Sequence, residues 1–243
     1  MANSYFQFKQ FRIHQEDVGM KVSTDACIQG ALAADKWQTE EKKLVLDIGT
    51  GTGLLTLILA QKMSSSEFIA LEIDENAIKK ATENFKNSNW SPQITLKPNS
   101  LQTYQPIEQQ FDNIICNPPF FHKHLNSHSL QRNIARHDEE LSKEHIAEKV
   151  TKLLKQNGSF CILYPASEWE AWEKISLKYG LYPKEIIEIQ PTIQKQANRI
   201  VGFYGLQKEN NPKKRRLIIY EEEAPNYTEA SKNLLIDYYL NIE

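Results

Sequence analysis

The chain has 243 residues, of which 40% are hydrophobic, 25% charged and 10% aromatic, a composition typical of globular proteins and not of collagen-like, coiled-coil or wholly disordered ones. This length corresponds to one or two domains of about 150 residues, and a core of that size needs no disulfide or structural metal. With 29 Lys and Arg against 31 Asp and Glu, the net charge of −2 gives no overall attraction to nucleic acid, so a polyanion would have to bind a local patch.

Nothing in the sequence indicates a membrane or secreted protein. The longest apolar-dominated run, residues 54–60, is far shorter than the ~20 residues that span a bilayer. The N-terminus lacks the basic and apolar regions of a signal or transit peptide. The three cysteines are widely spaced and odd in number, which gives no disulfide framework. These features predict a cytoplasmic protein.

The first 43 residues are expected to form an appendage and not a second domain. Thr24-Asp25 is typical of a helix start, and apolar residues continue at helical spacing through Leu32. From residue 44 onward, short β-rich apolar runs alternate with amphipathic stretches, which predicts a mostly parallel sheet covered by helices. The seven expected strands cover residues 44–46, 68–71, 94–96, 111–116, 159–164, 185–189 and 200–206.

Four helices are expected between these strands, at residues 54–63, 75–87, 143–155 and 167–179. Ser142 and Ser167 stand at N-cap positions, and Asn157-Gly158 and Gly180 are stop signals. Further on, a strand is expected at 217–220 and an amphipathic helix at 228–240. We expect residues 44–210 to form the main domain, with residues 211–243 packed on it as a strand and a helix.

A glycine-rich turn follows the first expected strand, in the sequence LVLDIGTGTG at residues 44–53. At such a strand end, the backbone and the following helix N-terminus can approach a nucleotide closely. The third glycine of a dinucleotide-binding GxGxxG motif would fall at Leu54, and no Walker GK[ST] is present. The pattern D-x-G-x-G-x-G instead resembles the cofactor loop of class I S-adenosyl-L-methionine (SAM) methyltransferases.

An acidic residue, Glu72, stands at the end of the next expected strand. A carboxylate there can accept hydrogen bonds from both hydroxyls of a ribose. A plain tight turn with a surface charge is the alternative, which the order of strand, loop, helix, strand and acid disfavours. The resemblance implies a Rossmann-like α/β fold and SAM as cofactor, bound by Asp47, Gly49, Thr50, Gly51, Gly53, Glu72 and Ile73.

The tetrapeptide Asn117-Pro118-Pro119-Phe120 ends the fourth expected strand. The prolines restrict the backbone, so that the Asn117 side chain and the Pro118 carbonyl are rigidly aimed. Two such acceptors favour a pyramidal nitrogen in an aromatic amine, whose lone pair can then point at a methyl group. Phe120 would stack on the ring, a contact worth about 1–3 kcal/mol. The tetrapeptide resembles the NPP[YFW] motif of methyltransferases that modify planar amines, and we expect its four residues to be catalytic, with Asn117 also beside the cofactor.

Beyond these motifs, the chain resembles the bacterial tRNA1(Val) (adenine(37)-N6)-methyltransferases over nearly its whole length. The resemblance rests on FKQF at 8–11, MKVSTD at 20–25, LQRNIARH at 130–137 and NYTEA at 226–230. It implies methylation of the adenine next to the anticodon of a valine tRNA, and it implies that Lys21, Thr24 and Asp25 line the cofactor site. Where relatives place an acid for the cofactor adenine, this chain has Asn99 and Ser100, which hydrogen-bond more weakly.

Two basic segments are candidate tRNA contacts. Residues 122–137 hold four histidines and no acid, and the cations Lys123, Arg132 and Arg136 in this segment can bind phosphates without reading sequence. The second segment is Lys213, Lys214, Arg215 and Arg216. A solvated loop or turn is the alternative for both.

Other chemistries are weaker interpretations. A metal site at His122, His124 and His128 would lack a Cys or carboxylate partner within the loop, so no metal is predicted. Cys116 ends an apolar strand with no histidine paired to it in sequence, which favours burial over nucleophilic catalysis.

Three other functions stay open from the sequence alone. A protein glutamine methyltransferase shares the NPP[YF] motif but has a separate helical domain before the cofactor loop, for which 43 residues leave little room. Methylation of another planar amine, such as an rRNA base, needs the same two motifs. A non-catalytic RNA-binding or assembly protein would keep the fold without turnover. No obligate protein partner is evident, and we expect a monomer.

Overall fold

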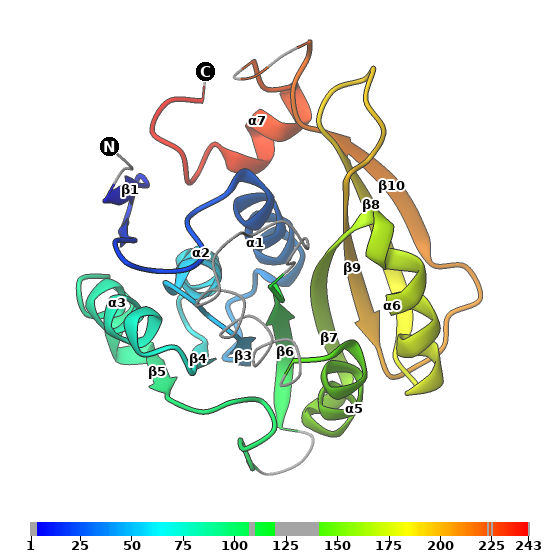
Figure 1. The fold of residues 1–243 in the computed structure, drawn as a ribbon, viewed down its shortest axis with the longest axis horizontal. Helices are drawn as coiled ribbons and strands as arrows, with labels where there is room; N and C mark the ends of the chain where they lie inside the picture. Colours follow the sequence, from blue (N-terminus) through cyan, green and yellow to red (C-terminus); the bar gives the residue numbers. More distant parts are fainter. Residues whose placement is uncertain (1–3, 107–109, 120–140, 223, 225, 243) are drawn as a thin grey trace, which may run out of the picture.

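The computed structural model describes residues 4–106, 110–119, 141–222, 224 and 226–242. Within these residues, eight strands form one sheet in the order β10-β8-β9-β7-β6-β3-β4-β5 (Figure 1). All of its strands run parallel except β9, which pairs antiparallel with both β7 and β8. The strands are β3 (Leu44–Ile48), β4 (Glu67–Leu71), β5 (Ile94–Lys97), β6 (Phe111–Cys116), β7 (Leu154–Pro165), β8 (Tyr182–Gln190), β9 (Arg199–Gly205) and β10 (Lys213–Ile218).

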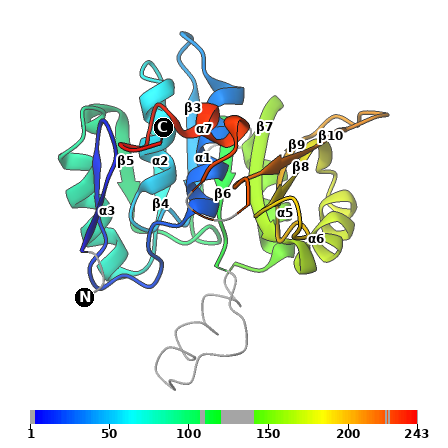
Figure 2. The same ribbon diagram turned by 90° about the horizontal axis from the view of Figure 1, so that it is seen from above.

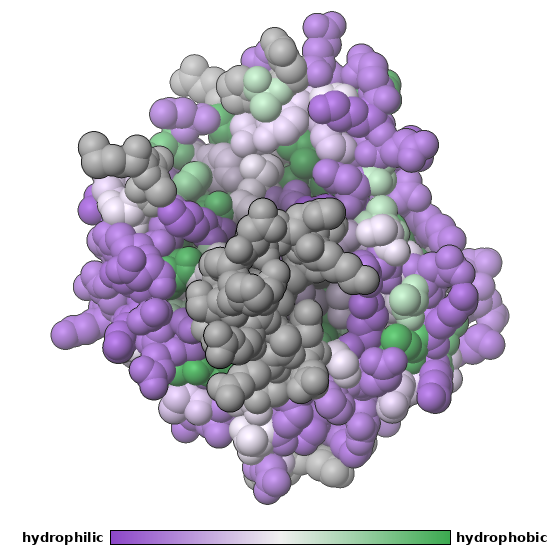
Figure 3. All heavy atoms as spheres, viewed as in Figure 1, coloured by the Kyte–Doolittle hydropathy of each residue, from purple (hydrophilic) through white to green (hydrophobic). Residues whose placement is uncertain are grey.

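Helices cover both faces of this sheet (Figure 2). One hydrophobic core lies under α1 (Thr24–Trp37), α2 (Leu54–Lys62), α3 (Glu75–Lys86) and α7 (Glu229–Leu235), and a second core lies under α5 (Lys143–Leu153) and α6 (Ala166–Lys178). A short 3-10 helix, η1 (Ser91–Gln93), precedes β5. The outer surface is mostly hydrophilic on the face shown in Figure 3. The prediction of a mostly parallel sheet with helices on both faces is confirmed.

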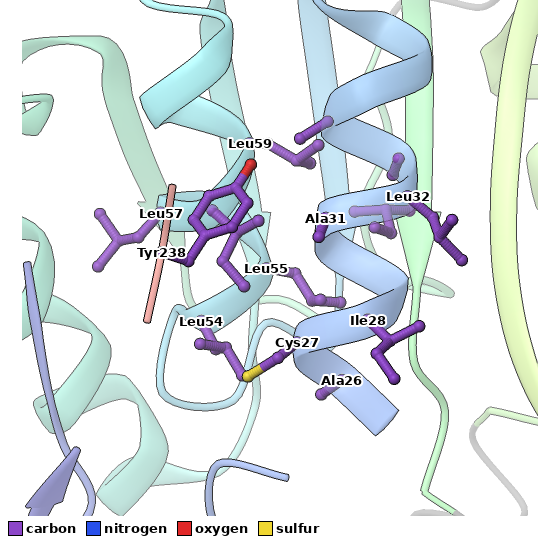
Figure 4. Close-up of a cluster of buried hydrophobic side chains, with 14 of the residues drawn as sticks. Ala26, Cys27, Ile28, Ala31, Leu32, Leu54, Leu55, Leu57, Leu59 and Tyr238 are labelled. Carbon is purple, nitrogen blue, oxygen red and sulfur yellow. The ribbon is translucent and has the colours of Figure 1, made fainter. Parts of the chain in front are cut away.

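The close packing of α1 on α2 depends on small residues in α1 (Figure 4). A Cβ placed on Gly30 would lie 3.0 Å from two side-chain carbons of Ile58, so a larger residue would force the helices apart. Leu55, Leu57 and Leu59 of α2 are buried in this layer, and full burial of such a side chain contributes about 1.5–3 kcal/mol. The segment predicted as an N-terminal appendage therefore supplies one helix of the main domain's core, and the boundaries after residues 43 and 210 stay predictions.

The two ends of the chain pack together beside the sheet. A hairpin of β1 (Tyr5–Gln7) and β2 (Arg12–His14) precedes α1. Phe8 bridges to Tyr239, and the Lys9 amide donates to the Tyr238 carbonyl at 2.8 Å. Asn84 of α3 accepts from the His14 amide at 2.8 Å and donates to the Thr52 carbonyl at 2.9 Å, which ties this hairpin to the glycine loop.

Three local predictions were wrong. The strand expected at 217–220 begins earlier, at Lys213, and joins the sheet as an eighth strand, β10, because the basic run is itself extended at the sheet edge, where charged residues are common. Ser167 lies inside α6, which starts directly after Pro165, and the Ala166 amide bonds to the Asn198 carbonyl at 3.1 Å instead of to a cap. Gly158 lies within β7 and does not end a helix. Ser142 caps α5 as predicted.

Candidate active site

The glycine loop leaves the sheet between β3 and α2, and its backbone requires glycine. Gly49, Gly51 and Gly53 have φ values of +68°, +58° and +87°, a region that other residues rarely adopt. A Cβ on Gly49 or Gly51 would meet nothing within 4 Å, so open space adjoins the loop at both positions. A Cβ on Gly53 would instead lie 2.4 Å from the Phe85 ring. The loop therefore leaves room for a ligand on one side and packs tightly on the other.

Asp47 is a buried carboxylate beneath this loop, 1% exposed. Its Oδ2 accepts hydrogen bonds from the hydroxyls of Thr50 at 2.6 Å and Thr56 at 2.7 Å, whereas its buried Oδ1 has no partner among the described residues. Burial raises the pKa of Asp47 to about 6, although the two hydroxyl bonds lower it. The unpartnered oxygen is available to a donor on a bound ligand.

The raised pKa of Asp47 makes the stability of the protein depend on pH. In the folded protein the Asp47 carboxyl keeps its proton up to about pH 6, whereas in the unfolded chain it releases the proton near pH 3.8. The stability that the protonated carboxyl contributes is therefore fully present below pH 3.8 and is lost as the pH rises through 6. Relative to Asp47→Asn, the wild type should lose up to about 1.4 kcal/mol of unfolding free energy per pH unit in this window. Denaturant titrations of both proteins from pH 4 to 8 measure this, and a constant difference would contradict it.

Glu72 directly follows β4, and its carboxylate fixes the backbone of the glycine loop. Its Oε2 accepts from the Gly51 amide at 2.8 Å, and its Oε1 accepts from the amides of Ile73 at 2.8 Å and Asp74 at 2.9 Å. A carboxylate has about four acceptor sites, so three bonds leave it room for one further donor. The Thr50 amide bonds to the Leu71 carbonyl at 2.8 Å, which fixes the loop against the end of β4.

Asn117 lies beside this loop because of the strand pairing. Parallel β3 and β6 place Ile48 opposite Cys116, so Gly49 and Asn117 leave the same edge of the sheet on neighbouring strands. The Asn117 Oδ1 atom is buried and has no hydrogen-bond partner within the described part of the chain, and Pro118 is buried next to it. A buried acceptor without a donor costs about 1–3 kcal/mol. An amine bound there would satisfy this oxygen.

A buried glutamine of α1 supports this strand end and was missed in the sequence. Gln29 is 0% exposed, and its Nε2 donates to the Cys116 carbonyl at 2.8 Å. The peptide that follows this carbonyl carries Asn117, so the bond fixes the backbone directly before the tetrapeptide. No pattern in the sequence indicates this contact, since Gln29 is a single polar residue within an apolar stretch of the helix.

We expect Gln29→Met, which keeps the volume but removes the donor, to lower kcat about tenfold while leaving the Kd for the cofactor unchanged. The reason is that a small displacement of a positioning group costs up to about 10²-fold in rate. Steady-state kinetics and calorimetry measure the two quantities. Ser176→Ala is the control, because Ser176 is also fully buried and its hydroxyl donates to the Glu173 carbonyl at 3.0 Å within α6, which covers a different core from α1. Equal kcat values in both variants would contradict a positioning role.

Comparisons with known proteins identify the family. Residues 28–164 match the family model described as Methyltransferase small domain. The chain is 33% identical to the tRNA1(Val) (adenine(37)-N6)-methyltransferase of Flavobacterium psychrophilum, over 98% of this chain and 100% of that protein. It is 34% identical to the protein of that name from Vibrio campbellii, over 98% and 96%. The chain belongs to this methyltransferase family. The resemblance drawn from its sequence motifs is confirmed.

Solved structures support the same methyltransferase fold. The crystal structure of a predicted O-methyltransferase from Agrobacterium tumefaciens superposes with a TM-score of 0.65 at 15% identity, over 88% of this chain and 96% of that one. A SAM dependent methyltransferase from Aquifex aeolicus gives a TM-score of 0.55 at 14% identity, over 75% and 93%. At such identities the likeness concerns the fold alone.

The other residues expected at the cofactor site of this methyltransferase occupy the same edge of the sheet or the segments next to it. Thr24 and Asp25 open α1, and Asp25 forms an ion pair with Arg199 at 2.9 Å. Lys21 is exposed ahead of α1. Ser100 follows β5, where its hydroxyl accepts from the Thr103 amide at 3.2 Å, and Asn99 is half-buried beside it.

The residues expected to contact RNA are placed only in part. Phe120, Lys123, Arg132 and Arg136 lie outside the described residues, as do His122, His124 and His128. Of the second basic segment, Arg215 pairs with Glu185 at 2.7 Å and Arg216 with Glu188 at 3.2 Å, while Lys213 and Lys214 are exposed at the start of β10. These pairs reduce the charge that β10 offers to a phosphate.

Two further features of the described chain bear on the chemistry. Cys116 is fully buried, and burial raises its pKa well above the ordinary value, which favours packing over a nucleophilic role. No group of three His, Cys, Asp or Glu that could hold a metal occurs among the described residues. No helix within them is long and apolar enough to cross a membrane.

Proposed function

We propose that this methyltransferase transfers a methyl group from SAM to the exocyclic N6 of an adenine in tRNA, specifically adenine 37 of a valine tRNA. The observation that carries the proposal is the buried, unpartnered Asn117 oxygen on the strand next to the cofactor loop. The curated relatives that match this chain over nearly its whole length bear the name of that activity.

The residues around the loop fit SAM. Open space adjoins Gly49 and Gly51, Glu72 has an unused acceptor site for a ribose hydroxyl, and Asp47 has an unpartnered oxygen. We assign Asn99 and Ser100 to the adenine side and Lys21, Thr24 and Asp25 to the opposite side of the cofactor. When bound, SAM supplies an electrophilic methyl group on a sulfonium.

The tetrapeptide prepares the target nitrogen. Asn117 Oδ1 and the Pro118 carbonyl accept hydrogen bonds from the two N–H groups of this amine, which favours a pyramidal nitrogen with an exposed lone pair. Phe120 would stack on the adenine. The methylated nitrogen is a strong acid, so its proton leaves without a dedicated base. The target base has to leave its stack, and this costs less in an anticodon loop than in a duplex. On the sequence alone, we assign phosphate contacts to Lys123, Arg132 and Arg136.

The proposal is tested by transfer of labelled methyl from SAM to separate pools of bulk tRNA, rRNA and a release-factor protein. Label in tRNA as N6-methyladenosine, absent with Asn117→Ala, is the expected result. Label on rRNA or protein would overturn the assignment of tRNA as the substrate. Label in none of the pools would favour a non-catalytic protein.

A further inference from the structure

A turn at the carboxyl edge of the sheet lies close to the proposed target site and has no role in the mechanism above. Residues 191–198 join β8 to β9 (Figure 1). The Asn198 carbonyl accepts from the Ala166 amide at 3.1 Å, which ties the turn to the end of β7. Because only β7 lies between β9 and β6 and neighbouring strands are about 4.8 Å apart, the end of the turn at β9 lies about 10 Å across the sheet from β6, the strand that precedes Asn117, and its start at β8 lies about 14 Å from it.

The side chains of this turn are unusual for a solvent-exposed loop. Ile193 is 68% exposed, more than any other large hydrophobic residue among those described. Gln194, Lys195 and Gln196 follow it and are also exposed. The sequence has no acidic residue between Glu188 and Glu209. The turn thus offers an apolar contact, amide groups and one cation in a row.

The turn is held rigidly over a hollow. Gln190 is 5% exposed, and its Nε2 donates to the carbonyls of Thr192 at 2.8 Å and Ile193 at 3.0 Å, so the backbone of the turn is fixed. Beside it lies a pocket of about 440 Å³, lined by the turn and by Ala166, Glu188, Ile200 and Arg216. A second hollow of about 420 Å³ shares Glu188, Ile200 and Arg216 and adds Glu173 and Lys214. Because the two hollows share three lining residues they adjoin each other, and together they are called the groove.

We infer that the turn 191–198 and this groove bind the RNA strand next to the target adenine; the inference rests on the proposed function. When the target adenine is held at Asn117, the nucleotide next to it in the RNA has to lie over the end of a neighbouring strand. Ile193 then contacts the face of a base, the glutamines reach its polar edge, and Lys195 contacts a phosphate, the mixture by which single-stranded RNA is bound. The turn itself carries no acid that would repel an RNA backbone, and Glu188 in the groove is paired with Arg216 at 3.2 Å.

The test compares two double variants matched in chemistry. Ile193→Ser with Lys195→Glu changes the turn, whereas Leu177→Ser with Lys208→Glu changes an apolar and a basic residue that are both exposed near the opposite edge of the sheet. Fluorescence anisotropy with labelled tRNA at several salt concentrations measures binding without turnover. We expect the turn variant to raise the Kd for tRNA at least tenfold and to reduce the salt slope by about 1 or more, with the Kd for SAM unchanged. The control should match the wild type.

The outcomes separate this inference from the proposed function. Equal tRNA binding by the wild type and the turn variant would overturn the inference while leaving methyl transfer to tRNA intact. A wild type that binds no tRNA would overturn both. Light scattering completes the test, since a dimer that only the turn variant loses would assign the surface to a second copy of the chain and overturn the RNA assignment.

Discussion

Asn117→Ala is expected to lower kcat by about 10²- to 10³-fold, the usual cost of removing one positioned group that stabilises a transition state. The Asn117 oxygen is buried and has no partner among the residues that the structure describes, so in the proposed mechanism its acceptor capacity serves the bound amine and not the fold. Removing it should leave the unfolding free energy unchanged or slightly higher, because an unsatisfied acceptor disappears. Single-turnover methyl transfer to tRNA measures the rate, and chemical denaturation measures the stability.

The control for this prediction is Asn76→Ala, which makes the same chemical change at an exposed position of α3. Its rate should equal that of the wild type. Calorimetry with SAM should give Kd values within a few-fold for all three proteins, because the glycine loop is untouched. A clear loss of stability in Asn117→Ala, with an unchanged rate, would show that the side chain is structural and would contradict the assignment.

The sequence predicted the parts of this site that depend on local pattern. Positive φ at Gly49, Gly51 and Gly53 follows from a glycine loop between a buried strand and a helix. The proximity of Asn117 to that loop follows from parallel strand order, since carboxyl ends of parallel strands share an edge. Both predictions need only the alternation of strands and helices.

Contacts between distant elements were not predictable in the same way. Gln29 reaches the Cys116 carbonyl across 87 positions. Asn84 reaches the hairpin at His14 across 70 positions and the glycine loop at Thr52 across 32. Each is a single polar residue whose partner is a backbone atom, and no spacing rule encodes such a partner. The strand expected at 217–220 was placed too late for a related reason: β10 begins at Lys213, and Lys or Arg at four successive positions shows no apolar alternation to reveal that start.

Gly53→Ala should damage both stability and cofactor binding. At φ +87° an alanine is strained by about 1–2 kcal/mol, and its Cβ would lie 2.4 Å from Phe85, too close for either group to stay in place. Phe85 is buried in α3, so relief requires a shift of the loop or of the helix. We expect a loss of about 3 kcal/mol in unfolding free energy, since overpacking alone costs about 1–3, and at least a tenfold weaker Kd for SAM.

Two further variants show whether the contact with the Phe85 ring causes the loss of stability. Gly19→Ala is the control, because its Cβ meets nothing within 4 Å and its backbone needs no positive φ. Gly53→Ala combined with Phe85→Leu removes the edge of the ring that the new Cβ would strike, so the double variant should lose less stability than the sum of the two single changes, by about 1 kcal/mol or more. The stability that the double variant loses relative to Phe85→Leu alone then measures the backbone strain. Strict additivity would mean that the loop moves away from Phe85 without resistance, and the weaker SAM binding would have to come from the φ strain alone.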